Sequence, residues 1–405
     1  MIGMPLGRLF DRSALSRIAD GLAVATAVSL PWSTSATGIL LVLLLLALIP
    51  TLDWADLRRE LVTPVGGLPV LLFLLGALGM TCADVSWHER FGGLSGFVRL
   101  LMVPLLMTQF RRSDGGQRVF IGFLSACVAL LMASFVVKIW PAIHPTLAIN
   151  EGVPVKSYIV QSVEFAMCAA VLLDLAAAKA RLRQWKIAGA FAVLALAFLG
   201  NIFFVTTGRT ALVVIPVLVL VYGFRHSGWK GIIGAGVAGL IAAAVVWTTS
   251  SYLRERVTGI YSEIMLYETK NEAKSSGVRI NFWTQSIRFI ESAPLLGHGT
   301  GSIGELFQRA AGGSEFTSNN PHNQTFAVGI QLGILGMAVL WAMWISQLLL
   351  FRGPGLLPWI GLVIVTSNIV GSLFNSFIFD FTEGWLYVLG VGVMAGMVQR
   401  TARES

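Results

Sequence analysis

SNNPHNQTFAVGIQLGILGMAVLWAMW, residues 318–344, is the stretch that decides both the fold and the site. It begins as a polar, turn-forming segment and becomes an apolar helix within a few residues of His322. This histidine therefore lies where water meets the membrane, and Asn323 follows it directly. Gly333 and Gly336 lie further along the same helix and carry no side chain that would hold a neighbouring helix away. The pattern predicts a site at the mouth of a helix bundle.

The composition places the chain among membrane proteins. Hydrophobic residues make up 55% of the 405 residues, charged residues only 12%, and the apolar residues fall in long blocks. A crossing helix needs roughly 20 mostly apolar residues. We therefore predict an all-α, polytopic membrane protein with about twelve transmembrane helices. The predicted spans are 14–32, 36–52, 66–83, 91–110, 118–140, 157–178, 186–206, 210–224, 230–250, 322–350, 356–375 and 379–399.

The distribution of basic residues predicts the topology. The net charge of +8 comes largely from Lys and Arg in alternate short connections, as expected for the cytoplasmic loops of a membrane protein and not for a protein that binds nucleic acid. Both termini should then be cytoplasmic. Three regions follow: helices one to nine in 1–250, one long loop on the outer side in 251–321, and helices ten to twelve in 322–405.

The long loop contains one helical pattern. RINFWTQSIRFIESA, residues 279–293, places Trp283, Ile287 and Ile290 on one face and polar residues, Arg288 among them, on the other. We predict an amphipathic helix on or near the membrane surface. PLLGHGTGS, which follows it, predicts a turn.

One glycine pattern is set aside as a cofactor motif. GAGVAG at 234–239 matches a dinucleotide-binding pattern, but it lies inside a membrane span with no strand before it. Close helix packing through small residues is the better interpretation.

Three kinds of residue could carry chemistry. An imidazole exchanges protons near neutral pH, so His322 is the candidate catalytic residue; its position also suits a histidine that only caps the helix. The outward arginines Arg209, Arg279 and Arg288 suit a phosphate ligand, although each could instead contact solvent or lipid headgroups. Asp380 and other acids within or beside the spans, Glu164, Asp174 and Glu383, suit either an ion path or partners for arginines. No grouping has metal-ligand spacing, so neither a metal nor another cofactor is predicted.

Three segments of the sequence resemble motifs of a known superfamily, that of the O-antigen ligases and polymerases. HNQTFAVGIQLGILG is similar to its signature of a histidine, a small polar residue, nine arbitrary residues and two small residues spaced by three. TTGRTA, around Arg209, is similar to its small-residue-plus-arginine motif. VRINFWTQSIRFIESAPLLGHGTGS is similar to a third segment, whose matching positions are Arg279, Trp283, Pro294, Gly297, Gly299 and Gly301.

The single long loop and the length of the chain resemble the ligases more than the polymerases. The resemblance implies a GT-C-like glycosyltransferase of the bacterial inner membrane with its site facing the periplasm. It would transfer a glycan from undecaprenyl pyrophosphate to lipid A core oligosaccharide, with inversion and without a metal. His322 would be the catalytic residue, the arginines would hold the pyrophosphate, and Asn323, Trp283 and Asp380 would support them.

Two other functions are compatible with the sequence. An O-antigen polymerase would use a lipid-linked acceptor in place of the lipid A core. A secondary transporter would use the intramembrane acids to couple flux to an ion gradient, although no internal repeat supports it.

Overall fold

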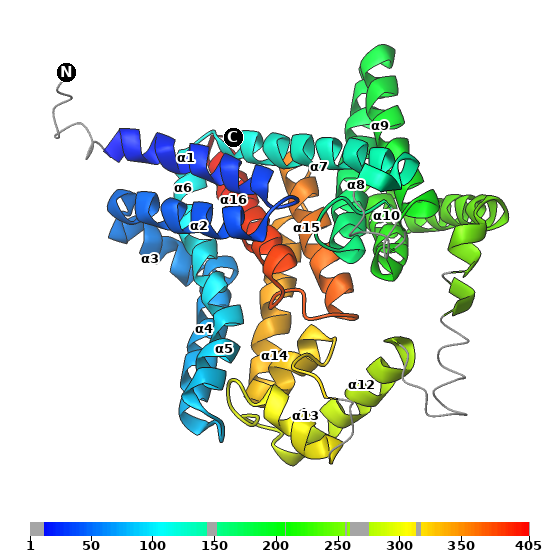
Figure 1. The fold of residues 1–405 in the computed structure, drawn as a ribbon. Coiled ribbons are helices and arrows are strands. Elements are labelled where there is room, and N and C mark those ends of the chain that lie inside the picture. Colours follow the sequence, from blue (N-terminus) through cyan, green and yellow to red (C-terminus); the bar gives the residue numbers. More distant parts are fainter. Residues whose placement is uncertain are drawn as a thin grey trace.

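The chain folds as a helical bundle in a computed structural model, which describes residues 12–143, 152–206, 208–255, 257–259, 275–312 and 317–404 (Figure 1). Every regular element within these residues is a helix, as predicted. The remainder of the predicted long loop, residues 256, 260–274 and 313–316, lies outside the described part of the chain.

The main helices are α1 (Arg12–Ser29), α2 (Thr34–Leu48), α3 (Trp54–Val62), α4 (Pro64–Cys82), α5 (Trp87–Val98), α6 (Met102–Arg112), α7 (Gly116–Ile139), α8 (Tyr158–Arg181), α9 (Trp185–Phe204), α10 (Arg209–Thr249), α12 (Ser275–Ser292), α13 (Ile303–Ala311), α14 (Gln324–Leu350), α15 (Leu356–Ser372) and α16 (Phe381–Glu404). Every predicted span corresponds to a helix, and α5 and α6 together form the fourth. The sequence did not predict α3 and α13, because both are short and lie between apolar blocks.

Nine helical segments among the described residues are long and apolar enough to cross a membrane. This number is smaller than the predicted twelve for three reasons. The α10 segment counts once although two predicted spans fall in it, α15 has only 17 residues, and α1 contains three charged residues in 18.

The α10 segment is a helical hairpin and not one long helix. Ser227 and Gly228 have non-helical backbone angles, with φ +57° at the glycine. A Cβ built on Gly223 would lie 2.3 Å from the Gly231 carbonyl oxygen and 2.7 Å from the Ala235 Cβ, so the two legs touch through small residues. Ala235 belongs to the GAGVAG segment, which confirms the interpretation of that segment as packing.

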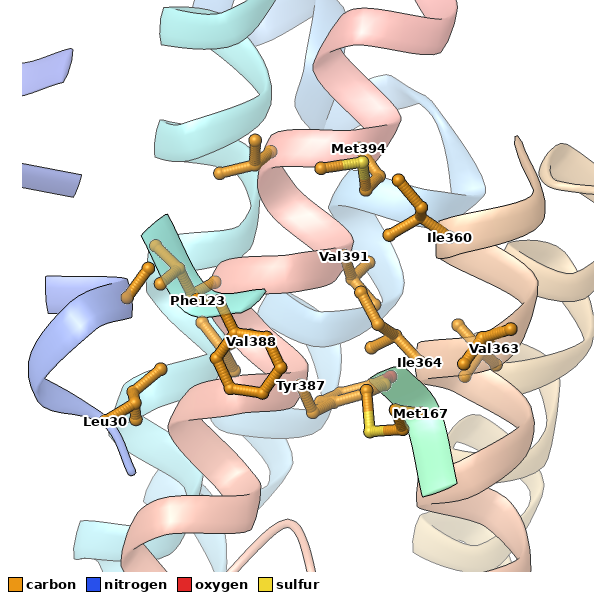
Figure 2. Packing of buried hydrophobic residues seen from close by; sticks show 14 of the residues in the cluster. Leu30, Phe123, Met167, Ile360, Val363, Ile364, Tyr387, Val388, Val391 and Met394 are labelled. Carbon is orange, nitrogen blue, oxygen red and sulfur yellow. The ribbon is translucent and has the colours of Figure 1, made fainter. Parts of the chain in front are cut away.

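The core is apolar and joins several helices. In Figure 2, Phe123 of α7, Met167 of α8, Ile364 of α15 and Tyr387 of α16 lie in one cluster with Leu30, which follows α1. All five side chains are buried. Because these helices pack around one cluster, they form a common frame for the site.

Two basic connections meet at one end of this frame. Arg111 at the end of α6 forms an ion pair with the buried Glu60 of α3. The side chain of Gln109 donates a hydrogen bond to Asp20 of α1 over 2.9 Å. The connections before α4 and before α7 therefore lie together with the N-terminal helix, as the charge pattern predicted.

Helix α14 is broken at Gly333, and the turn after α12 fills the break. Gly333 has φ +61°, a conformation that costs an ordinary residue energy. The backbone amide of His298 donates to the Ile330 carbonyl over 2.8 Å, and the Ile334 amide donates to the Pro294 carbonyl over 2.8 Å. Backbone groups that the break would orphan are thus satisfied. The predicted turn at 294–302 is confirmed, and its position anchors α12 against α14.

Helix α12 confirms that residues 279–293 are helical, but its buried face is shifted by about one residue from the predicted apolar face. Phe282 and Ser286 are buried, whereas Ile287, predicted on the apolar face of a helix at the membrane surface, is 46% exposed, so the face packed against the protein is not the one that carries Ile287. The buried side chains face a small cluster with Phe307 of α13 and Ile330 of α14. These tertiary contacts, which the helical pattern alone does not specify, decide which face is buried.

Candidate active site

His322 lies immediately before α14, at the point where the chain turns into the helix. Its φ is +54°, and its backbone amide donates to the side-chain oxygen of Asn320 over 2.8 Å. The helix is capped by Asn323, whose side chain accepts from the Phe326 amide over 3.1 Å and donates to the Leu373 carbonyl over 3.2 Å. Because Asn323 supplies the cap, the His322 ring is available for another role.

A chain of hydrogen bonds orients the His322 ring. Nδ1 of His322 is 3.0 Å from Oδ1 of Asn375, and Nδ2 of Asn375 donates to Oδ2 of Asp380 over 2.7 Å. Asn320 also donates to Oδ1 of Asn375, over 3.2 Å. These partners fix the amide so that its oxygen faces the imidazole. Nδ1 therefore carries the proton, and Nε2 keeps its lone pair.

The surroundings keep this imidazole neutral. Burial lowers the pKa of His322 below its ordinary 6.5, the hydrogen bond to Asn375 opposes this effect, and the charge of Arg279 lowers the pKa further. Phe282 of α12 covers one side of the ring, with ring centroids 6.2 Å apart and planes 22° from parallel. Nε2 has no hydrogen-bond partner among the described residues. A neutral imidazole with an open Nε2 can accept a proton.

The predicted arginines occupy three different environments. Arg279 of α12 lies close enough to His322 for its charge to act on the imidazole. Arg288, nine residues or about two and a half helical turns further along α12, is exposed. Arg209 begins α10, and its Nη2 lies 3.8 Å from where a Cβ on Gly259 would be. Of the three, Arg279 is the one whose charge acts on His322.

Asp380 joins the network from the connection before α16. Burial raises its pKa to about 7, the charge of Glu383 raises it further, and the charge of Arg99 lowers it. The Arg99 guanidinium also donates to the Asp380 backbone carbonyl. Arg99 is buried between α5 and α6. It holds the connection that carries both Asn375 and Asp380.

Trp283 supports the site from α12. It is half-buried, and its ring meets Phe326 edge-on with centroids 6.4 Å apart. This contact holds α12 against the first turn of α14, next to His322.

Several residues of the network were not predicted. Asn320, Asn375, Ser376 and Arg99 have no motif of their own, although a charge inside the apolar block 91–110 was a visible signal for Arg99. The hydroxyl of Ser376 donates to Oδ1 of Asn320 over 2.7 Å. Polar residues in 318–323 and 372–376 meet only because α14 and α15 bring these connections together.

A pocket with both polar and apolar lining lies beside the network. It has a volume of about 380 Å³ and lies between α5, the start of α13 and the connection before α16. Asn319 and Phe379 form part of its wall. These two residues directly precede Asn320 and Asp380 in the chain, so the pocket adjoins the histidine network.

Fold and site together define a multi-pass helical membrane protein with a histidine-centred polar site at the end of its bundle. Residues 194–341, which include Arg209, α12 and His322, match the model of a family described as O-antigen ligase. The family is one of enzymes. No curated protein matches the sequence.

Proposed function

We propose that this protein is a membrane glycosyltransferase that transfers O-antigen glycan from undecaprenyl pyrophosphate to lipid A core oligosaccharide. The observation that carries the proposal is the geometry of His322, whose Nδ1 is bound to Asn375 and whose Nε2 has no hydrogen-bond partner among the described residues. The family match supports the general reaction class, and the choice of ligase over polymerase rests on the single long loop in the sequence.

In the proposed step, a hydroxyl oxygen of the acceptor attacks the anomeric carbon of the donor sugar. The hydroxyl proton passes to Nε2 of His322, and the bond between the anomeric carbon and the pyrophosphate oxygen breaks. The leaving group takes the electron pair and departs as undecaprenyl pyrophosphate. Attack from the side opposite to the leaving group inverts the anomeric configuration. General base catalysis of this kind contributes about 100- to 10,000-fold to the rate.

Charge neutralisation is the second part of the proposal. Negative charge develops on the pyrophosphate as the glycosidic bond breaks, and a nearby guanidinium stabilises it most effectively where water is excluded. Arg279 is best placed for this role because its charge already acts on His322. Arg209 and Arg288 are proposed to contact donor phosphate further from the reacting carbon.

The proposed location is the bacterial inner membrane, with the site facing the periplasm. The charge pattern assigns the basic connections around Arg111, at the end of α6, to the cytoplasm. It assigns the connection that carries His322, immediately before α14, to the periplasm. A thiol-reactive label that cannot cross the membrane tests this topology. A cysteine at exposed Arg288 should react in intact spheroplasts, and one at exposed Arg59 should react only after permeabilisation; the reverse pattern would refute the orientation.

Reconstitution tests the reaction itself. The purified full-length protein is given lipid-linked glycan as donor and either rough lipopolysaccharide or a second lipid-linked glycan as acceptor. Transfer to rough lipopolysaccharide supports the ligase, and transfer only to the lipid-linked acceptor identifies a polymerase. No transfer to either acceptor would favour the transporter. A chelator should leave the rate unchanged; a loss that Mg²⁺ restores would contradict the metal-independent mechanism.

A further inference from the structure

The 380 Å³ pocket beside the histidine network has no role in the proton transfer just described. One wall is the face of α5 that carries Gly92, Gly93 and Gly96, and the opposite wall includes Gly301 and Gly304. The glycines on the two walls approach closely, because a Cβ on Gly93 would lie 2.5 Å from the Gly301 amide nitrogen. Gly93 and Gly301 thus let the two walls meet, and Gly92, where a Cβ would meet no atom within 4 Å, leaves open space for a ligand.

The polar side chains of the pocket suit a ligand rich in hydroxyl groups. Gln331 is buried, accepts from the Gly301 amide over 2.8 Å and donates to the Ala327 carbonyl over 2.9 Å. It retains one amide hydrogen and one lone pair. His88 and Glu89 line the α5 side, and Glu89 uses one oxygen to cap the helix at Ser86. Both donors and acceptors therefore face the cavity, as recognition of sugar hydroxyls requires.

The charge of the pocket argues against a phosphate ligand. Among the described residues, its lining includes the acid Glu89 and no Lys or Arg. The neighbouring Arg90 is bound to backbone carbonyls of Val85 and Met80, each over 2.9 Å. A pyrophosphate would meet a carboxylate here without a guanidinium to offset it. The lining chemistry thus differs from that of the Arg279 side of His322.

The outer surface of α5 indicates that the ligand is attached to a lipid. Trp87 and Phe91 are 60% and 63% exposed on this helix, and aromatic residues at a helix end are typical of the membrane interface. A molecule with a sugar headgroup in the pocket could keep its acyl chains in the bilayer beside these rings.

We propose that this pocket is the acceptor subsite, which binds the saccharide headgroup of a membrane-anchored glycolipid and presents its hydroxyl to His322. The inference rests on the proposed function and adds the place of the acceptor. Donor pyrophosphate lies on the Arg279 side, and acceptor saccharide lies on the α5 side. Asn319 and Phe379, which line the pocket and directly precede Asn320 and Asp380 of the network, position the incoming hydroxyl.

Gly92→Leu tests the subsite because it adds a large side chain to the lining of the pocket at a position with space for its Cβ. A Cβ on Gly92 meets no atom within 4 Å, although the residue lines the pocket. Gly189→Leu is the matched control, since Gly189 is an exposed helical glycine of α9 that also has no atom within 4 Å of its Cβ. Gly92→Leu should raise the KM for rough lipopolysaccharide about tenfold or more, as pocket-filling changes commonly do, with donor KM unchanged. The control should change neither constant.

Glu89→Gln is a second variant that keeps the helix cap, because glutamine also serves at this position of a capping box. It should raise acceptor KM a few-fold and leave donor KM unchanged. An increase in donor KM in either variant would overturn the inference by showing that the pocket holds the donor. Unchanged constants for both substrates would overturn it as well.

Direct binding separates this inference from the proposed function. Soluble core oligosaccharide is titrated against wild-type protein and Gly92→Leu in saturation-transfer NMR. Loss of the signal in the variant supports the subsite even if the wild-type protein transfers no glycan to rough lipopolysaccharide. Equal signals overturn the inference even if transfer is normal.

Discussion

Nδ1 of His322 and Oδ1 of Asn375 lie 3.0 Å apart, and the same amide donates to Asp380 through its nitrogen. The Asn375 amide lies between the His322 imidazole and the Asp380 carboxylate. Its oxygen fixes the tautomer of the imidazole, as a directly bound carboxylate would, but it places no negative charge next to the ring. A directly bound carboxylate would raise the histidine pKa strongly. The arrangement therefore holds His322 as an oriented, neutral base at physiological pH.

His322→Ala should abolish glycan transfer, because Nε2 is the group that accepts the hydroxyl proton in the proposed step. The loss expected from removing a general base is about 100- to 10,000-fold. It is measured as transfer by the purified protein and as the lipopolysaccharide ladder in cells. Expression and membrane insertion should be normal, since the α14 cap belongs to Asn323.

His226→Ala is the matched control for this substitution. His226 lies at the turn of the α10 hairpin and is paired with Asp174 over 3.5 Å, outside the His322 network. Normal transfer in this variant, together with loss in His322→Ala, ties the effect to one imidazole. A normal ladder in His322→Ala cells would refute the catalytic role.

Two substitutions should shift the acid limb of kcat/KM in opposite directions. Activity requires neutral His322, so it rises as pH passes upward through the histidine pKa. The charge of Arg279 lowers this pKa, so Arg279→Gln should move the limb to higher pH. The hydrogen bond that His322 donates to Asn375 raises this pKa, so Asn375→Ala should move the limb to lower pH while the loss of the fixed tautomer reduces the plateau. The pH dependence of kcat/KM for each purified variant measures both effects; shifts in the same direction would contradict the assignment of His322 as the titrating base.

Much of the helical frame could be predicted, because membrane-spanning helices appear in a sequence as long apolar blocks. Long apolar blocks required helices, and each predicted span corresponds to a helix or to one leg of α10. His322 and Asp380 were also recognisable, since both fall within predicted membrane spans, where ionisable residues are rare. What the sequence did not specify was the polar contact between them. Asn375 becomes a bridge only after α14 and α15 have packed.

The positions of the arginines likewise depend on tertiary packing that the sequence did not specify. Arg279 and Arg288 lie nine residues apart on one predicted helix, and the sequence offered both as phosphate ligands. Packing of Phe282 and Ser286 against α13 and α14 then determines the rotation of α12. This rotation brings Arg279 to His322 and leaves Arg288 exposed.

Arg279→Ala should therefore weaken donor use more than Arg288→Ala. Loss of a charge-assisted contact to phosphate costs about 1.5–3 kcal/mol, which corresponds to an increase of about 10- to 100-fold in donor KM. Arg288→Ala, which removes an exposed arginine of the same helix, is the matched comparison and should raise donor KM by about fivefold or less, because an exposed ion pair is worth only about 0.2–1 kcal/mol. Initial rates at varied donor concentration measure the difference. Equal effects of the two substitutions would show that the guanidinium near His322 has no special role in holding the donor.

Gly333→Ala should destabilise the protein, because the residue has φ +61° and no space for a side chain. A Cβ there would lie 2.4 Å from the carbonyl carbon of Leu295. The left-handed conformation alone costs about 1–3 kcal/mol, and displacement of the turn would also break the bond from the Ile334 amide to Pro294. Thermal unfolding in detergent should show a lower midpoint and, because the turn anchors α12, weaker transfer activity. Gly200→Ala is the control: this helical glycine of α9 has no atom within 4 Å of a built Cβ, so the change should leave the midpoint equal or slightly higher. An unchanged midpoint in Gly333→Ala would mean that α14 is not broken at this glycine.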